Sequence, residues 1–336
     1  MQGSVWGRLR HVGAACLLLS VSPPGVAGQS APLVYVTNER SGDITVIDTG
    51  SDQVVATIPV GEGRPRGIQV SPDGRTVYVA LSDDARTIET DRDAIAIVDV
   101  ASGEVTERLP GGTDPEQFAV SPDGSRLYVA NEDAGTASII DLASGRVLAT
   151  LTVGIEPEGV AVSPDGRWVY VTAETSNTVS VIDAEGGRVA ATFLVDIRPR
   201  AAAFSPDGRR AYVTAEIGGT LSVVDAEAHK VIDVIELEAG EAKPVGVAVS
   251  PDGRRAYVAN GHADNVAVID AETLQVIATV AVGTRPWGIA VTPDGRKIYT
   301  ANGVSGDVSV IDAKTLQVIA TIPAGEGPWG VAVVGG

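Results

Sequence analysis

The stretch that decides the fold runs from Gly246 to Val282 and reads GVAVSPDGRRAYVANGHADNVAVIDAETLQVIATVAV. Four short runs rich in Val, Ile and Ala, at 246–249, 256–260, 265–270 and 276–282, are separated by polar turn residues. Apolar runs of this length and composition predict strands rather than helices. The Ser-Pro-Asp-Gly between the first two predicts a tight turn, because Pro presets φ, Asp caps the turn and Gly accepts a positive φ.

This unit recurs along the chain. All seven tyrosines fall at one position of the repeat, 42 to 50 residues apart: Tyr35, Tyr78, Tyr128, Tyr170, Tyr212, Tyr257 and Tyr299. A period of about 40–50 residues with four strands per unit is typical of a propeller blade. We therefore predict one all-β domain over 29–336, a seven-bladed β-propeller of four-stranded blades.

The two ends of the repeat array predict how the ring closes. The first apolar run, 33–37, corresponds to the second strand of a unit, and the last run, 330–334, corresponds to a first strand. We expect the C-terminal strand to complete the N-terminal blade, because closing the ring removes the exposed strand edges of an open array.

The first 28 residues predict a Sec-type signal peptide. Arg8 and Arg10 form a basic start, residues 12–22 are apolar, and small residues lead to a cleavage site near Ala27 or Gly28. Cys16, the single cysteine, lies in the apolar run; GAAC (13–16) loosely resembles a lipoprotein box, but the apolar run continues past it. We expect a periplasmic or secreted protein without membrane insertion, since no later segment has about 18 uninterrupted apolar residues.

The charge limits the partners. The formal net charge is −18, and it becomes about −20 when Arg8 and Arg10 are removed with the signal peptide. Nucleic acid and anionic membranes need a basic footprint, so neither is expected as a partner. A monomer is the expected state.

Several motifs carry a family resemblance. VYVTN (34–38) resembles the signature of the YVTN family of β-propellers, and EPEGVAVSPDGRWV (156–169), RPR (198–200) and PWGV (328–331) follow in order. Together they resemble the exported seven-bladed proteins associated with catabolism that depends on pyrroloquinoline quinone (PQQ). The resemblance implies a PQQ-dependent dehydrogenase or another periplasmic protein as partner. The long loop 82–93 and the short stretch 236–243 depart from this pattern.

A proline opens the first strand of each unit, and the residue after it is predicted to line the mouth of the central channel. In ring order these residues are Arg66, Glu116, Glu158, Arg200, Val245, Trp287 and Trp329. Arg64, Arg198 and Arg285, two positions earlier, add positive charge. Two interpretations stay open. Ion pairs Arg66–Glu116 and Glu158–Arg200 close the mouth while the tryptophans plug it, or the mouth binds a flat carboxylated ligand, for which PQQ is a candidate.

Three other features are weaker candidates. Glu89, Asp91 and Asp93 alternate in an acidic loop and are a candidate Ca²⁺ site, although the pattern and glycine of an EF-hand are missing and a solvated loop is the favoured interpretation. His262 lies in a loop on the mouth side and is a candidate general base or axial haem ligand. His229 is expected at the opposite surface.

The sequence contains no Gly-x-Ser-x-Gly elbow, P-loop or His-Glu-x-x-His motif. The leading prediction is therefore a non-catalytic binding or scaffold protein of PQQ-dependent alcohol oxidation. The alternative is a propeller enzyme, either a lactonase-like hydrolase or a haem-binding oxidoreductase, because one fold hosts many activities.

Overall fold

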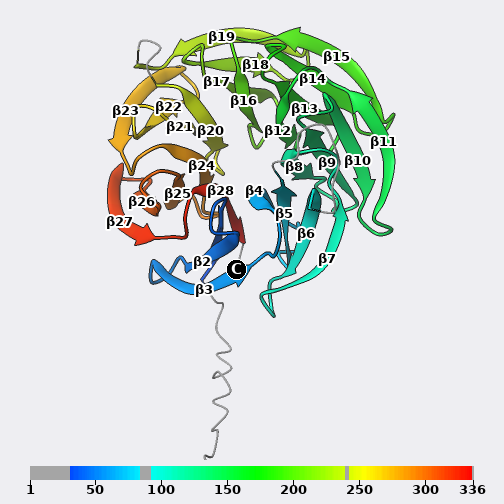
Figure 1. Ribbon diagram of the computed structural model, residues 1–336. Coiled ribbons are helices and arrows are strands. Elements are labelled where there is room, and N and C mark those ends of the chain that lie inside the picture. The colour runs from blue at the N-terminus through cyan, green and yellow to red at the C-terminus, as the bar shows by residue number, and fades with distance from the viewer. Residues whose placement is uncertain (1–30, 84–91, 239–241, 335–336) are drawn as a thin grey trace, which may run out of the picture. The chain divides into compact units, whose positions relative to one another are not determined.

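Residues 31–83, 92–238 and 242–334 are described by the computed structural model, and they form seven antiparallel sheets of four strands around a central axis (Figure 1). The all-β seven-bladed propeller is confirmed. Its strands are β1 (Leu33–Asn38), β2 (Asp43–Asp48), β3 (Gln53–Pro59), β4 (Arg64–Val70), β5 (Thr76–Ser82), β6 (Ala94–Asp99), β7 (Glu104–Pro110), β8 (Pro115–Val120), β9 (Arg126–Asn131), β10 (Thr136–Asp141), β11 (Arg146–Thr152), β12 (Pro157–Val162), β13 (Trp168–Ala173), β14 (Thr178–Asp183), β15 (Arg188–Leu194), β16 (Pro199–Phe204), β17 (Arg210–Ala215), β18 (Thr220–Asp225), β19 (Lys230–Glu236), β20 (Pro244–Val249), β21 (Arg255–Asn260), β22 (Asn265–Asp270), β23 (Gln275–Ala281), β24 (Pro286–Val291), β25 (Lys297–Asn302), β26 (Asp307–Asp312), β27 (Gln317–Pro323) and β28 (Pro328–Val334). Within these residues no helix is long and apolar enough to cross a membrane.

Blade 1 contains both ends of the described chain. Its sheet has the order β28-β1-β2-β3, and β28 pairs antiparallel with β1, with Leu33 opposite Val334 and Val36 opposite Val331. The predicted closure is therefore confirmed. Blades 2 to 7 follow as β4–β7, β8–β11, β12–β15, β16–β19, β20–β23 and β24–β27.

The seven inner strands are crowded at the axis. A Cβ added to Gly159 would lie 2.2 Å from the Arg200 carbonyl oxygen of the next blade, and one added to Gly246 would lie 2.3 Å from that of Trp287. Since real Cβ atoms do not approach so closely, only glycine fits these positions without a backbone shift. The pairing register also shifts here, as between Pro244 and Val247 of β20. This bulge turns the residue after each proline toward the channel mouth.

Threonines in the second strands tie neighbouring blades together. The Thr172 hydroxyl donates to the Arg200 carbonyl at 3.0 Å and accepts the Gly159 amide at 2.8 Å. Thr37 bonds the Arg66 carbonyl (2.7 Å) and the Gly330 amide (2.8 Å) in the same way. The backbone groups that the bulges release are therefore paired across blades, and the rim residues are held in place.

Candidate functional site at the channel mouth

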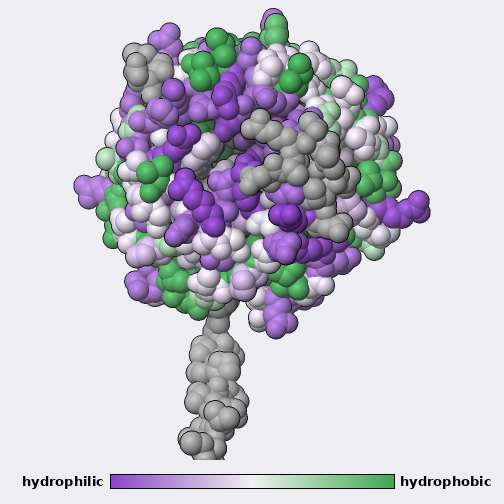
Figure 2. All heavy atoms as spheres, in the orientation of Figure 1, coloured by the Kyte–Doolittle hydropathy of each residue, from purple (hydrophilic) through white to green (hydrophobic). Residues whose placement is uncertain are grey.

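One face of the ring, which we call the mouth face, holds the starting ends of the inner strands. The loops after the second strands lie on the same face; these strands are β1, β5, β9, β13, β17, β21 and β25. Figure 2 shows this face, where hydrophilic side chains gather around a central hollow. The predicted rim residues all stand at the start of inner strands. Both predicted ion pairs are present: Arg66 contacts Glu116, and Arg200 Nη1 lies 3.2 Å from Glu158 Oε2.

A second layer of acids surrounds the rim, and sequence analysis missed it. The residue four positions after the repeat tyrosine is glutamate in four blades, at Glu39, Glu132, Glu174 and Glu216. In blades 6 and 7 the same position is Gly261 and Gly303. Aligning the repeats at this position would have revealed the layer, because a turn alone does not require glutamate there.

The first of two ion networks centres on Arg66. Its Nε lies 3.1 Å from Glu39 Oε1, and its Nη1 contacts Glu116 and lies 4.0 Å from Glu132 Oε2. Arg64 extends the network, with Nη1 3.3 Å from Glu39 Oε1 and Nη2 4.0 Å from Asp114 Oδ1. The Glu116 side chain is only 1% exposed, so this charge is desolvated and depends on Arg66.

The second network centres on Arg200. Its guanidinium contacts Glu174, lies 3.2 Å from Glu158 Oε2 and lies 3.4 Å from Glu216 Oε2. Arg198 contacts the same carboxylates from the outer side of the network: its Nε lies 2.8 Å from Glu174 Oε2 and 3.2 Å from Glu216 Oε2. One buried arginine thus pairs with three carboxylates, two from blade 4 (Glu158 and Glu174) and one from blade 5 (Glu216).

Carboxylates outnumber arginines at the mouth. Seven acids share these contacts (Glu39, Asp114, Glu116, Glu132, Glu158, Glu174 and Glu216), whereas the arginines are Arg64, Arg66, Arg198, Arg200 and Arg285. Burial, with the nearby charges of Glu158 and Asp114, raises the pKa of Glu132 to about 7. Burial also raises the pKa of Asp114. Glu132 therefore exchanges a proton near neutral pH, as an acid–base catalyst must.

The raised pKa of Glu132 predicts a pH-dependent cost to stability. The unfolded chain loses this proton near the ordinary value of 4.5 and the folded chain near 7, so stability falls as pH rises between these values. We expect Glu132→Gln to equal the wild type in free energy of unfolding at pH 4 and to exceed it by about 3 kcal/mol at pH 8. Urea unfolding at both pH values measures this. The exposed variant Glu185→Gln is the control, and a pH-independent difference for Glu132→Gln would contradict the assignment.

An apolar arc completes the mouth. The rings of Trp287 and Trp329 stack with centroids 6.1 Å apart and planes 18° apart. The guanidiniums of Arg200 and Arg285 lie 5.2 Å and 5.0 Å from the Trp287 ring centroid. A Cβ at Gly303 would come within 2.7 Å of Trp287 Cδ1, so the glycine makes room for the indole. The tryptophans therefore stack on each other, with two arginines over Trp287, and both ion pairs of the first interpretation are formed beside them.

The described carboxylates offer one group suited to a metal ion. Oxygens of Asp114, Glu116 and Glu132 lie within 4.8 Å of one another, although Arg66 already contacts Glu116. Of the predicted Ca²⁺ ligands, Glu89 and Asp91 lie outside the described residues. Asp93 is buried, and its Oδ1 accepts the Asp83 amide at 3.2 Å.

The two described histidines differ in setting. His262 is exposed in a mouth-face loop. His229 was expected at the surface, but it is half-buried: its Nδ1 lies 2.9 Å from the Tyr170 hydroxyl, and its ring packs edge-on against Trp168 at 4.6 Å. Burial is the main reason that its pKa is lowered. His229 is thus a packing residue between blades 4 and 5.

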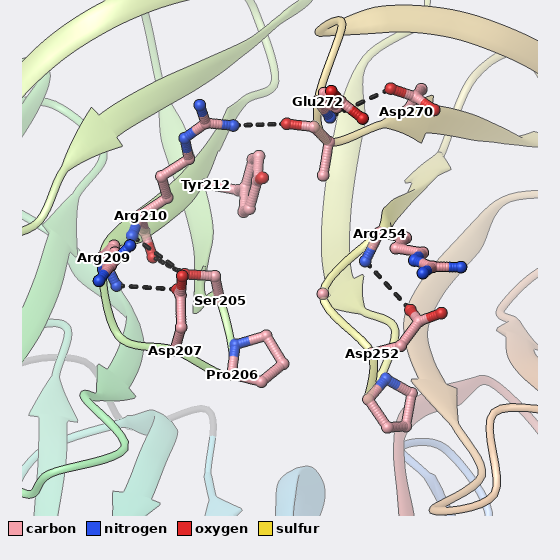
Figure 3. A pocket seen from close by; sticks show the side chains of 13 residues that line it. Ser205, Pro206, Asp207, Arg209, Arg210, Tyr212, Asp252, Arg254, Asp270 and Glu272 are labelled. Carbon is pink, nitrogen blue, oxygen red and sulfur yellow. Dashed lines mark hydrogen bonds between the residues drawn. The ribbon is translucent and has the colours of Figure 1, made fainter.

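The opposite face carries a larger hollow with different chemistry. A groove of about 680 Å³ lies between blades 5 and 6, where Arg210 reaches across to the Ala271 carbonyl (Figure 3). Its Asp207 and Asp252 cap the turns: the serine hydroxyl two residues before each donates to it, as does a backbone amide, and both bonds lower its pKa. Related grooves recur at other junctions. The residues that form the groove are repeated from blade to blade, whereas the residues at the mouth differ between blades.

Two family models match parts of the chain. "Lactonase, 7-bladed beta-propeller" matches residues 196–318, and "Cytochrome D1 heme domain" matches residues 82–193. The hydrazine synthase subunit beta of Kuenenia stuttgartiensis is 30% identical over 91 residues, and Antigen Lp49 of Leptospira interrogans is 27% identical over 126 residues. These matches span 26% and 34% of this chain and only 22% and 27% of the relatives.

Solved structures share the fold over nearly the whole chain. A "putative 6-phosphogluconolactonase" from Bacteroides uniformis superposes with a TM-score of 0.77 at 18% identity, covering 91% of this chain and 100% of that one. The dihydro-heme d1 dehydrogenase NirN, in complex with DHE, gives a TM-score of 0.68 at 19% identity, covering 92% and 76%. At such identity the likeness shows the fold. The class is therefore a seven-bladed β-propeller.

These comparisons correct two predictions. The expectation of a non-catalytic protein is wrong, because several of the similar propellers are named for enzymes, a lactonase family and a haem d1 dehydrogenase among them. The cofactor class to which they point is a haem-type group and not PQQ. The mouth gives a physical reason against PQQ: its arginines already contact carboxylates or Trp287, and a tricarboxylate would add negative charge to a surplus of acids.

Proposed function

We propose that the protein is a hydrolase that opens lactones, which are cyclic esters, at the channel mouth. The observation that carries the proposal is the position of Glu132, partly buried and within 4.0 Å of the Arg66 guanidinium, with a pKa of about 7. A carboxylate of this kind beside a fixed cation is suited to ester hydrolysis. The match of the lactonase family model to residues 196–318 supports the same reaction class.

The mechanism uses Glu132 first as a base and then as an acid. The Glu132 carboxylate takes a proton from a water molecule while the water oxygen attacks the lactone carbonyl carbon. The Arg66 guanidinium stabilises the negative charge that develops on the carbonyl oxygen. The ring carbon–oxygen bond then breaks, and protonated Glu132 returns its proton to the leaving alkoxide. One water is consumed, and the product is an open-chain hydroxy acid.

A haem-type group is the second candidate, because the cytochrome D1 haem domain model and the NirN structure both match. The described residues do not fit it in the mouth. Trp287 and Trp329 stack on each other, so their facing ring surfaces are not open to a haem. The crevice beside them measures about 30 Å³, whereas a ligand as large as haem needs a pocket of several hundred Å³. His229 is committed to Tyr170, which leaves exposed His262 as the available described histidine. A Soret band after haem addition that is lost in His262→Ala would reverse this assignment.

Hydrolysis tests the proposal. The purified full chain, with a panel of five- and six-membered lactones, is expected to release protons, followed with a pH indicator, at a rate proportional to enzyme. Glu132→Gln keeps the shape of the side chain but cannot take the proton, so kcat/KM should fall by a factor of about 10²–10⁴. Glu185→Gln, an exposed residue of the opposite face, should match the wild type. Equal rates for Glu132→Gln and wild type would refute the proposed role.

A further inference from the structure

The geometry points to the class of lactone that the mouth takes: an uncharged ring carrying a short aliphatic arm, rather than a phosphorylated or polyhydroxylated sugar lactone. This inference rests on the proposed function and deepens it. It depends on a crevice in the apolar arc, on the residue that joins this crevice to Glu132, and on the charge of the mouth.

The crevice offers hydrocarbon walls. It measures about 30 Å³ and is lined by Trp287, Trp329, Val245, Ala201 and the glycines beside them, and also by Arg200, Glu158 and Gln117. Val245 and Trp329 are 9% and 7% exposed. Arg200 and Glu158 are engaged with each other at 3.2 Å. A hydroxyl placed against these walls would lose its water partners, whereas a group of roughly one or two carbon atoms gains from burial.

Arg200 links this crevice to the acid–base group. Its guanidinium lies 5.2 Å from the Trp287 ring centroid and lines the crevice. It is also one of the cations whose charge acts on the Glu132 carboxyl. In the pose that we infer, a lactone ring in the hollow presents its carbonyl toward Glu132 and Arg66, and a substituent on the ring enters the crevice lined by Arg200.

The charge of the mouth selects against anionic substrates. Arg64, Arg66, Arg198 and Arg200 each contact at least one carboxylate, and the acids of the mouth outnumber its arginines. A phosphate would meet surplus carboxylates without a free arginine of these networks to pair with it. The net charge of −18 on the whole chain acts in the same direction.

A substrate series tests the inference. We measure kcat/KM for γ-butyrolactone, its methyl- and ethyl-substituted forms, gluconolactone and 6-phosphogluconolactone. The kcat/KM for the ethyl-substituted lactone should exceed that for γ-butyrolactone roughly tenfold. The kcat/KM for both sugar lactones should fall below that for γ-butyrolactone. Val245→Phe fills the crevice, so the preference for the ethyl arm should drop to near one. The matched control, Val304→Phe at an exposed loop residue, should keep it.

The outcomes separate this inference from the proposed function. If either sugar lactone is the better substrate, or if Val245→Phe keeps the wild-type preference, the inference is wrong while lactone hydrolysis stands. If no lactone of the series is opened, the inference and the proposed function fall together. Should Val245→Phe fail to fold, the wild-type series alone decides, because the ranking of the ethyl-substituted, unsubstituted and sugar lactones is itself predicted.

Discussion

Arg200→Ala is expected to lower the free energy of unfolding by about 3–5 kcal/mol at pH 7. The substitution removes the cation shared by Glu158, Glu174 and Glu216, whose side chains are only 6%, 4% and 10% exposed. Arg198 can compensate only in part, because it contacts Glu174 and Glu216 from the outer side and its own side chain is 45% exposed. Removing one partner from a buried ion network leaves the other charges desolvated and unpaired. The expected loss of stability is therefore large. Urea unfolding followed by tryptophan fluorescence measures it.

The matched control for Arg200 is Arg188→Ala. Arg188 Nη2 lies 3.2 Å from Asp183 Oδ2, but its side chain is 66% exposed, so water screens the pair. We expect a change of about 0–1 kcal/mol. A similar small loss for Arg200→Ala would mean that the mouth network contributes little, and the account of a desolvated acidic site would then be contradicted.

Ending the chain after Gly327 is expected to abolish cooperative folding. The truncation removes β28, so that β1 loses its inner partner and the ring opens at blade 1. It also removes Trp329, Ala332 and Val334, which are buried, from the interior. Burial of a large apolar side chain is worth about 1.5–3 kcal/mol, and the exposed strand edge favours aggregation. Thermal unfolding by circular dichroism and size-exclusion chromatography report both effects.

Adding the missing strand back provides the control for the truncation. A synthetic peptide with residues 325–336 should restore part of the unfolding transition, because antiparallel pairing with β1 supplies the same backbone bonds. A truncated chain that melts like the wild type would show that closure by β28 is dispensable. That result would contradict the ring architecture as the source of stability.

The fold was predictable because it rests on a repeated local pattern. The tyrosine spacing defined the blades, the turn chemistry of Ser-Pro-Asp-Gly separated the inner strands from the second ones, and the unmatched run at 330–334 predicted closure. The crowding at Gly159 and Gly246 also follows from the repeat, since each inner strand must approach the axis. None of these inferences needs a long-range side-chain contact.

The site was predictable only in part. The rim residues and two of their ion pairs followed from the repeat proline. Glu132 and Glu174 follow only from an alignment of the repeats four positions after the tyrosine, and even that alignment does not give their arginine partners. How seven acids share five arginines depends on distances between blades, which spacing along the chain does not give. His229 shows the same limit: its partners Trp168 and Tyr170 belong to a different blade.

The central claim is that Glu132 acts as the base at the mouth, and the pH dependence of lactone opening tests it most directly. For the wild type, log kcat/KM should rise with unit slope below about pH 7 and level off above it, since the carboxylate is the active form. Glu132→Gln should show a low rate without this inflection. A wild-type profile that is flat between pH 5 and pH 9, or a Glu132→Gln profile that keeps the inflection, would contradict the account.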